Sequence, residues 1–169
     1  GQFNHGFIIA SHCDDLYIID QHASDEKYNY EQLMEKYIAR PQPLVRPVRV
    51  AMEAHEVELA LEHKAELRRH GFLVSLCETP DVSNGAIATN ALHVASVPVL
   101  PYDTVTPHDV LELTQQLLQY GALVKPIRAV WHSMATKACR SSIMIGTVLS
   151  DKTMQDIVKH LGTMHQPWN

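Results

Sequence analysis

The sequence predicts a mixed α/β fold, and three observations support this class. Short apolar runs bounded by polar turns, such as Phe7–Ala10 and Leu16–Ile19, are typical of strands. Elsewhere, apolar residues recur every three or four positions, which is typical of amphipathic helices. The chain has 169 residues, of which 46% are hydrophobic and 20% charged, so it can bury a core of its own.

The N-terminal part is expected to be two strands followed by a helix. The runs Phe7–Ala10 and Leu16–Ile19 are joined by the polar residues 11–15, which indicates a tight turn. After Asp20 the period changes to that of a helix, and Pro41 and Pro43 end it. Its apolar stripe comprises Tyr30, Leu33, Met34, Tyr37 and Ile38.

The central part alternates strands and helices. Strands are expected at 44–50, 72–76 and 92–97, and residues 78–90 form the longest polar interruption, which predicts a mobile loop. One helix carries Val57, Ala60, Leu61 and Leu67 and ends at Arg68–His70 before Gly71. A second begins at Thr106, with Pro107 in its first turn, and ends at Gly121.

Two more helical patterns follow Pro126, with a serine-rich turn between them. The first runs from Ile127 to Ala138 and the second from Met154 to Leu161. The prolines at 41, 43 and 126 bracket the central elements. We therefore expect an outer subdomain made of residues 1–39 and 126–169, interrupted by an inserted subdomain of residues 40–125.

Composition excludes several classes of protein. No apolar stretch approaches the ~20 residues that span a bilayer, which excludes a membrane protein. The formal charge is −5 and no basic run is present, so tight nucleic-acid binding by this chain alone is not expected. Cys13, Cys77 and Cys139 are widely spaced, which indicates a reducing intracellular compartment and no disulfide framework. The chain does not begin with Met, and we expect any address signal to lie elsewhere.

The segment Asp20–Glu26 is the strongest candidate for chemistry, at the junction of a predicted strand and helix. His22 and Glu26 are four residues apart, so they share one face of a helix. An imidazole nitrogen and a carboxylate oxygen suit Zn²⁺ or Mn²⁺. Asp20 could cap the helix, orient His22 or reach a metal itself.

A purely structural role for these residues stays open. Asp20 would then be a helix cap, His22 a hydrogen-bonded histidine of the core, and Glu26 an acid favoured near a helix N-terminus. Glu31 lies five residues after Glu26 and turns to another face of the helix. We expect it behind the metal ligands or on the surface.

Cys139 is a second candidate, at the end of a helix rich in small residues. A cysteine beside alanine and serine is usually a small buried apolar residue. Its thiolate would also be the soft ligand that completes a zinc site with a histidine and a glutamate. The neighbouring Arg140 could favour the thiolate or hold a phosphate. Cys13 and Cys77 have no equally placed partner, so we expect structural roles for both.

Residues Gln42–Pro47 form an extended segment bounded by prolines, with Gln42 ahead of the apolar Leu44 and Val45. A segment of this kind can fill a hydrophobic groove on a partner protein. Composition alone favours an edge strand that prolines protect from aggregation. The residues alone do not decide between a partner-binding segment and an edge strand.

Several segments match one family pattern in the same order. Asp20–Ala23, Glu26 and Glu31 match the motif Asp-Gln-His-Ala-x-x-Glu-x-x-x-x-Glu without a departure. The other similar segments are Gly1–Asn4, Gly6–Ile9, Ala138–Arg140, Ser142–Gly146 and His165–Asn169. Over essentially its whole length, the chain resembles the C-terminal domain of MutL-homologue mismatch-repair proteins, specifically the Pms-type endonuclease subunit of the eukaryotic heterodimer.

This resemblance implies a fold and a set of site residues. The fold would be a dimerisation subdomain interrupted by an inserted regulatory subdomain. His22, Glu26 and Cys139 would be metal ligands, and Asp20 would be a catalytic or metal-binding acid. Supporting or phosphate-binding roles would fall to Gln21, Glu31 and Arg140. The sliding-clamp-binding residues would be Gln42, Leu44, Val45 and Pro47.

The resemblance also implies an activity and partners. We expect an endonuclease that nicks one strand of duplex DNA by two-metal hydrolysis, with Zn²⁺ or Mn²⁺ or both as cofactors. The partners would be a MutL-homologue subunit, the sliding clamp and duplex DNA, in the nucleus. Little DNA affinity is expected from this acidic chain alone, so the clamp and the rest of the protein would deliver the substrate.

One departure and two alternatives accompany this interpretation. The family continues after Pro-Trp-Asn with a Cys-Pro-x-Gly-Arg-Pro segment that completes the metal site, so we expect further ligands from a longer chain or a partner. His132 or His165 is a weaker substitute. The alternative function is a non-catalytic dimerisation and clamp-binding module. A zinc peptidase is disfavoured because its motif needs glutamate directly after the first histidine, where this chain has Ala23.

Overall fold

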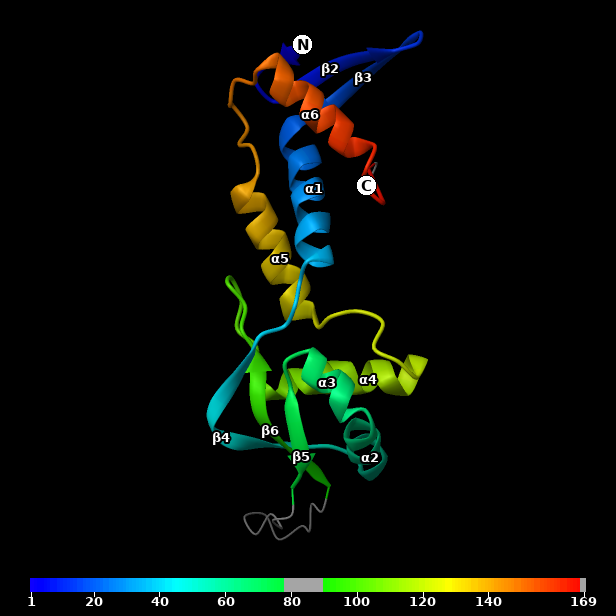
Figure 1. Ribbon diagram of the computed structural model, residues 1–169, viewed down its shortest axis with the longest axis vertical. Helices are drawn as coiled ribbons and strands as arrows, with labels where there is room; N and C mark the ends of the chain where they lie inside the picture. The colour runs from blue at the N-terminus through cyan, green and yellow to red at the C-terminus, as the bar shows by residue number, and fades with distance from the viewer. Residues whose placement is uncertain (78–89, 168–169) are drawn as a thin grey trace. The chain divides into compact units, whose positions relative to one another are not determined.

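The computed structural model describes residues 1–77 and 90–167, which fall into two compact units (Figure 1). The first unit comprises Gly1–Tyr37 and Ser133–Asn169, and the second comprises Ile38–His132. Each contains a three-stranded antiparallel sheet together with helices, which confirms the mixed α/β class. The assignment of dimerisation and regulatory roles to 1–39 with 126–169 and to 40–125 stays a prediction. Residues 78–89 of the predicted loop lie outside the described residues.

The sheet of the first unit has the order β1-β2-β3, with β1 at Gln2–Phe3, β2 at Phe7–His12 and β3 at Asp15–Asp20. Ile8 is paired with Ile19, and both are buried. Their face of the sheet shares a core with α6 (Asp151–Leu161) through Met154, Ile157, Leu161 and the following Met164. The amphipathic pattern of α6 explains this packing, since its apolar residues recur at helical spacing.

The opposite face of this sheet is open and apolar. Phe3 pairs with Phe7, and Ile9 with Ile18, so alternation places these side chains on the side away from the Ile8–Ile19 core. Leu16 joins them opposite Ser11. The exposed members are Phe3, Phe7, Leu16 and Ile18, and we call these four residues the open sheet face.

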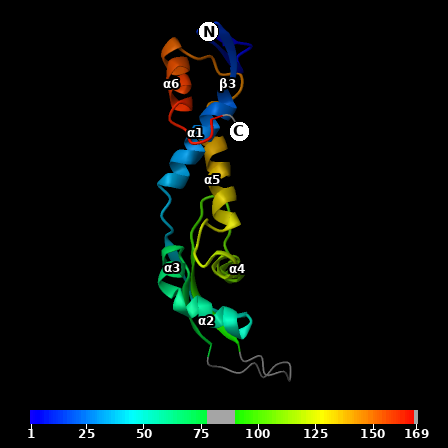
Figure 2. The ribbon, with the colours of Figure 1, turned by 90° about the vertical axis from the view of Figure 1, so that its right-hand side faces the viewer.

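Helix α1 (Gln21–Glu35) begins directly after β3, and Asp20 is both the last residue of β3 and the N-cap of α1. As the last residue of β3 it has extended backbone, and its Oδ1 accepts a hydrogen bond of 2.9 Å from the Ala23 backbone N–H. This is an N-cap, which satisfies a donor that the helix leaves unpaired. Beside α1 runs the later part of α5 (Arg128–Ser141), as both views show (Figure 1 and Figure 2).

The second unit has a sheet of order β4-β6-β5, with β4 at Pro41–Ala51, β6 at Ala91–Pro98 and β5 at Leu73–Leu76. Its helices are α2 (Ala54–Glu62), α3 (Lys64–Arg69) and α4 (Val110–Tyr120), the last preceded by the 3₁₀ turn η1 (Pro107–Asp109). Core residues that are at most 2% exposed include Val50, Leu67, Phe72, Leu92, Val94, Val110, Leu113 and Leu117.

A close backbone contact follows α3 in this unit. Gly71 has φ +91°, and a Cβ built there would lie 2.8 Å from the Cβ of Pro98. Ser96 bridges the same corner, since its hydroxyl donates to the Gly71 carbonyl and accepts from the Leu73 backbone N–H. The predicted helix end at Gly71 therefore reflects both a left-handed backbone and a lack of space for a side chain.

The predicted elements are confirmed with a few corrections. Strand β1 was not predicted, because two residues are too short to show alternation. The single helix expected through Leu67 is two helices that meet at His63, which caps the end of α2 and the start of α3. Helix α1 ends at Glu35, before the last two residues of its predicted stripe, Tyr37 and Ile38, and Ile38 is 81% exposed. Within the described parts of the chain, no helix has the length and apolar character to cross a membrane.

Candidate metal centre

Three predicted ligands from distant parts of the chain come together in the first unit. His22 lies in the first turn of α1, Glu26 one turn later, and Cys139 near the end of α5. His22 Nε2 is 3.4 Å from Glu26 Oε2 and 3.6 Å from Cys139 Sγ. Among residues 1–77 and 90–167, these three side chains form a group that could hold a metal ion, with donor atoms all within 4.8 Å of one another.

The two shorter separations match the spacing of ligands around tetrahedral zinc. Bond lengths of about 2.0–2.3 Å and tetrahedral angles place a nitrogen and an oxygen ligand about 3.4 Å apart, and a nitrogen and a sulfur ligand about 3.6 Å apart. The 3.4 Å contact between His22 and Glu26 is longer than a well-formed hydrogen bond between nitrogen and oxygen, and all three side chains offer atoms with lone pairs. The set of donors therefore fits a shared cation.

The orientation of the His22 ring is fixed from its other side. Nδ1 lies 2.8 Å from the backbone carbonyl oxygen of Ile143, which can only accept a hydrogen bond. Nδ1 must therefore carry a proton, and in the neutral ring the lone pair lies on Nε2. Nε2 is the nitrogen that faces Glu26 and Cys139, so the ring is held in the tautomer that a metal requires.

Asp20 and Glu31 have defined partners in the structure. One oxygen of Asp20 caps α1, as described above, and Asp20 is not a member of the three-residue group. Glu31 accepts hydrogen bonds from the backbone N–H groups of His165, at 2.8 Å, and Gln166, at 3.4 Å. Glu31 therefore contacts the segment after α6, and its supporting role for the ligands stays a prediction.

Gln21 is fully buried and joins three segments of the first unit. Its Nε2 lies within hydrogen-bonding distance of the carbonyls of His5, Met144 and Thr147. Its Oε1 accepts from Gln2 Nε2 at 2.7 Å. The side chain is thus surrounded by hydrogen-bond partners inside the protein, and its surroundings favour a structural role over a phosphate-binding one.

The remaining predicted site residues are not members of this group. Arg140 is exposed at the end of α5. The segment Gln42–Pro47 lies within β4, an edge strand of the second unit, where the pairing with β6 is interrupted between Pro43 and Val48. Neither His132 nor His165 belongs to the three-residue group, and His132 Nδ1 instead lies 3.1 Å from Asp103 Oδ2.

Sequence reasoning missed two residues of α1, Asp25 and Asn29, that bind the 142–143 segment next to His22. Asp25 Oδ2 accepts from the Ile143 backbone N–H at 2.9 Å. Asn29 donates to the same carboxylate oxygen at 3.3 Å and to the Ser142 hydroxyl at 2.9 Å. Asp25 and Asn29 are four residues apart, on a stripe of α1 next to that of His22 and Glu26, and this spacing was the signal that could have found them.

Cys77 also has a partner that the sequence did not indicate. Its thiol lies 3.2 Å from His93 Nε2, at the end of β5 and within β6 of the second unit. Cys77 is buried, whereas Cys13 is exposed at the turn between β2 and β3, with φ +53°. No disulfide joins these cysteines, since all three are free.

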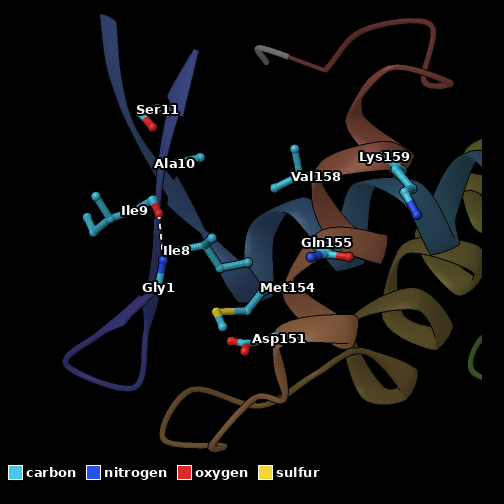
Figure 3. Close-up of a pocket in the computed structure, with 10 residues that line it drawn as sticks. All are labelled: Gly1, Ile8, Ile9, Ala10, Ser11, Asp151, Met154, Gln155, Val158 and Lys159. Carbon is cyan, nitrogen blue, oxygen red and sulfur yellow. Dashed lines mark hydrogen bonds between the residues drawn. The ribbon is translucent and has the colours of Figure 1, made fainter.

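A hollow of several hundred Å³ occurs in each unit. One of about 530 Å³ separates β2 from α6 and is lined by Ile8, Ala10, Met154 and Val158 among others (Figure 3). Another, of about 620 Å³, lies in the second unit beside Trp131 and Glu112. None of the three grouped ligands lines either hollow.

Known proteins similar to this chain agree with the sequence resemblance. The family described as MutL C terminal dimerisation domain matches residues 1–149. The chain is 38% identical over 169 residues to the DNA mismatch repair protein pms1 of Schizosaccharomyces pombe, covering 100% of the chain and 20% of that protein. It is 36% identical over 170 residues to the mismatch repair endonuclease PMS2 of Homo sapiens, covering 100% of the chain and 19% of that protein.

A bacterial relative extends the comparison. The chain is 29% identical over 171 residues to the DNA mismatch repair protein MutL of Halothermothrix orenii, covering 99% of the chain and 25% of that protein. The chain spans about a fifth of the length of the first curated relatives it matches. With a family match over 149 of its residues and these relatives along its whole length, the chain belongs to the family of MutL C-terminal dimerisation domains.

Proposed function

We propose that this chain carries the metal centre of a mismatch-repair endonuclease that nicks one strand of duplex DNA. The observation that supports it most directly is the grouping of His22, Glu26 and Cys139, with the lone pair of His22 aimed at the other two donors. The human relative is named a mismatch repair endonuclease, which agrees with this activity. A mixed nitrogen, oxygen and sulfur set suits Zn²⁺, and Mn²⁺ remains the second candidate.

In this proposal the protein's own groups bind and orient. His22, Glu26 and Cys139 would hold the cation, with Cys139 as thiolate. A bound cation would polarise the phosphodiester and lower the pKa of a coordinated water. Asp20 uses one carboxylate oxygen to cap α1, so its second oxygen would be available to bind metal or accept a proton from the attacking water.

The activity test uses the heterodimer with its MutL-homologue partner, the sliding clamp and a supercoiled plasmid. Glu26→Gln removes one ligand charge, and we expect it to abolish Mn²⁺-dependent nicking. Glu35→Gln, at the exposed end of the same helix, is the matched control and should leave nicking unchanged. Equal nicking by the Glu26→Gln variant would overturn the proposal.

Metal content provides a second test that does not depend on DNA. After dialysis against Zn²⁺, elemental analysis should find less bound metal in Cys139→Ser than in the wild-type chain with its partner present. Equal metal content in the two proteins would remove Cys139 from the site. Absence of metal from both would favour the alternative function, a dimerisation module without a nuclease centre.

We further propose that the open sheet face is where a MutL-homologue partner docks. Its exposed residues are large and apolar, and Leu16 and Ile18 are each 68% exposed. Such side chains, adjacent on one sheet face, favour an interface rather than a solvated surface. The occupant is a second MutL-type domain because the chain belongs to a dimerisation family.

Charge reversal tests this docking face. Ile18→Glu should prevent heterodimer formation in size-exclusion chromatography with light scattering, because a carboxylate would be buried without a partner. Asp14→Lys, at the exposed turn of the same sheet, is the control and should still dimerise. A stable heterodimer containing the Ile18→Glu subunit would contradict this assignment.

The clamp-binding segment Gln42–Pro47 is also retained as a proposal. Val45 is fully exposed and the strand pairing is interrupted around it, which leaves a short apolar peptide available to a groove. Gln42→Ala combined with Leu44→Ala should weaken a pull-down with the clamp without lowering thermal stability. Unchanged capture would leave β4 with only its role as a protected edge strand.

Delivery of the DNA substrate by the clamp agrees with the net charge of −5, since an acidic chain binds DNA weakly by itself. We place the repair reaction in the nucleus.

A further inference from the structure

The backbone of one residue, Ile143, is held by two side chains of α1 beside the candidate ligands. The backbone N–H of Ile143 donates to Asp25 Oδ2 at 2.9 Å, and the carbonyl of the same residue accepts from His22 Nδ1 at 2.8 Å. Asp25 and His22 are three residues apart, so both reach this residue from one side of the helix. Asp25 and His22 are therefore coupled through the backbone of Ile143.

A second set of contacts fixes Asp25 itself. Asn29 donates to Asp25 Oδ2 and to the hydroxyl of Ser142, and that hydroxyl donates to the Ala138 carbonyl at 2.7 Å. Ala138 immediately precedes Cys139. The network thus ties α1 to the end of α5 at the point where Cys139 approaches His22.

We propose that Asp25 is a positioning residue for the metal centre. By accepting the Ile143 N–H it holds the adjacent carbonyl toward His22 Nδ1, which keeps the proton on Nδ1 and the lone pair on Nε2. Without this acceptor Ile143 loses the hydrogen bond that fixes its N–H, so its carbonyl is held less firmly against His22 Nδ1, the contact that selects the tautomer. This inference rests on the proposed role of His22 as a ligand and extends it to residues that touch no metal.

Metal affinity distinguishes a positioning role of Asp25 from a purely structural one. A general packing role would lower the stability of the first unit and leave the affinity of the folded protein unchanged. A positioning role lowers the affinity itself, and residues that orient a ligand through hydrogen bonds typically change it about 10- to 100-fold. Metal affinity is therefore measured on the folded protein, below the unfolding temperature of each variant.

The experiment titrates Co²⁺ into the chain with its MutL-homologue partner present and follows visible absorption, with Zn²⁺ competition to give relative affinities. We expect Asp25→Ala to weaken Co²⁺ binding about 10-fold or more and to change the thiolate charge-transfer band. Asp25→Asn keeps one carbonyl-type oxygen as an acceptor, so it should recover most of the affinity. Asp14→Ala, an exposed aspartate of the same unit, is the control and should match the wild type.

The outcomes separate this inference from the proposed function. If His22→Ala abolishes Co²⁺ binding while Asp25→Ala binds like the wild type, the metal centre stands and the positioning role is wrong. If Asp25→Asn is as weak as Asp25→Ala, the negative charge and not the acceptor oxygen matters, which also overturns the hydrogen-bond account. If the wild-type chain binds no Co²⁺ in the presence of its partner, the proposed metal centre and this inference fail together.

Discussion

Leu67, Phe72 and Leu92 of the second unit are fully buried, whereas Leu16 and Ile18 of the first unit's sheet are 68% exposed. The second unit covers its sheet with side chains from its own helices and builds a core of aliphatic and aromatic residues. The first unit buries one face of its sheet, against α6, and leaves the other open. The difference indicates that the second unit's core is complete within its own residues, whereas the first unit leaves an apolar sheet face that is available for the partner proposed above.

Polar residues also have different roles in the two units. In the first unit the fully buried Gln21 connects the N-terminal turn, α1 and the segment after α5 through side-chain hydrogen bonds. In the second unit the buried Ser96 makes one local bridge beside Gly71. Buried hydrogen bonds whose groups are all paired favour one arrangement of the segments around them. A metal site needs such a fixed arrangement because its ligand atoms must lie at set distances from one another.

The largest expected effect is a cavity in the core of the second unit. Leu92 is 0% exposed on the central strand β6, so Leu92→Ala should lower the free energy of unfolding by about 2–5 kcal/mol. Leu118→Ala, at a position 47% exposed on α4, should change it by no more than about 0.5 kcal/mol. Chemical denaturation of the two variants measures both values. Similar losses would contradict the picture of a self-contained core.

The next largest effect concerns the polar centre of the first unit. Gln21→Ala leaves several backbone carbonyls and the Gln2 side chain with fewer hydrogen-bond partners. It should therefore lower the free energy of unfolding by about 1–3 kcal/mol. Hydrogen exchange followed by mass spectrometry should localise the loss of protection to the segments around His5 and Thr147. Gln32→Ala, on the more accessible part of the same helix, serves as the control. Unchanged exchange would show that packing alone holds these segments.

A smaller, pH-dependent effect is expected at the end of α3. Burial lowers the pKa of His70 from its ordinary value of 6.5, and the nearby Glu66 opposes this in part. The unfolded chain therefore takes up this proton at a higher pH than the folded chain, so stability falls as the pH drops below about 6.5. His70→Asn should reduce that fall, and His55→Asn, at an exposed position, should not. Thermal melts between pH 5 and pH 8 compare the three proteins.

The smallest effect should occur on the open sheet face. Ile18→Thr replaces one β-branched residue with another at a position that is 68% exposed. The free energy of unfolding of the chain without its partner should therefore change by no more than about 0.5 kcal/mol. A thermal melt of the chain alone measures this. A larger loss would mean that Ile18 packs within the chain and is not held open for a partner.

Much of the fold was predictable because the relevant signals are local. The short apolar runs Phe7–Ala10 and Leu16–Ile19 identified two strands, and Thr106 and Gly121 identified both ends of a helical segment. Strand β1 and the break at His63 were not predictable, since a two-residue strand and a change of helix axis depend on packing. The shared face of His22 and Glu26 followed directly from a spacing of four residues.

The sequence by itself determined the family, the α/β class and the pair of candidate ligands on α1. It did so because motif spacing and periodicity are properties of neighbouring residues. Only the tertiary structure placed Cys139 beside His22 across 117 positions of chain, and only it set the Ile143 carbonyl against Nδ1. Those contacts depend on how α5 and the segment after it pack on α1, and no local pattern encodes that packing. The same packing placed Asp25 behind the ligands, where the sequence showed only an acid on a helix.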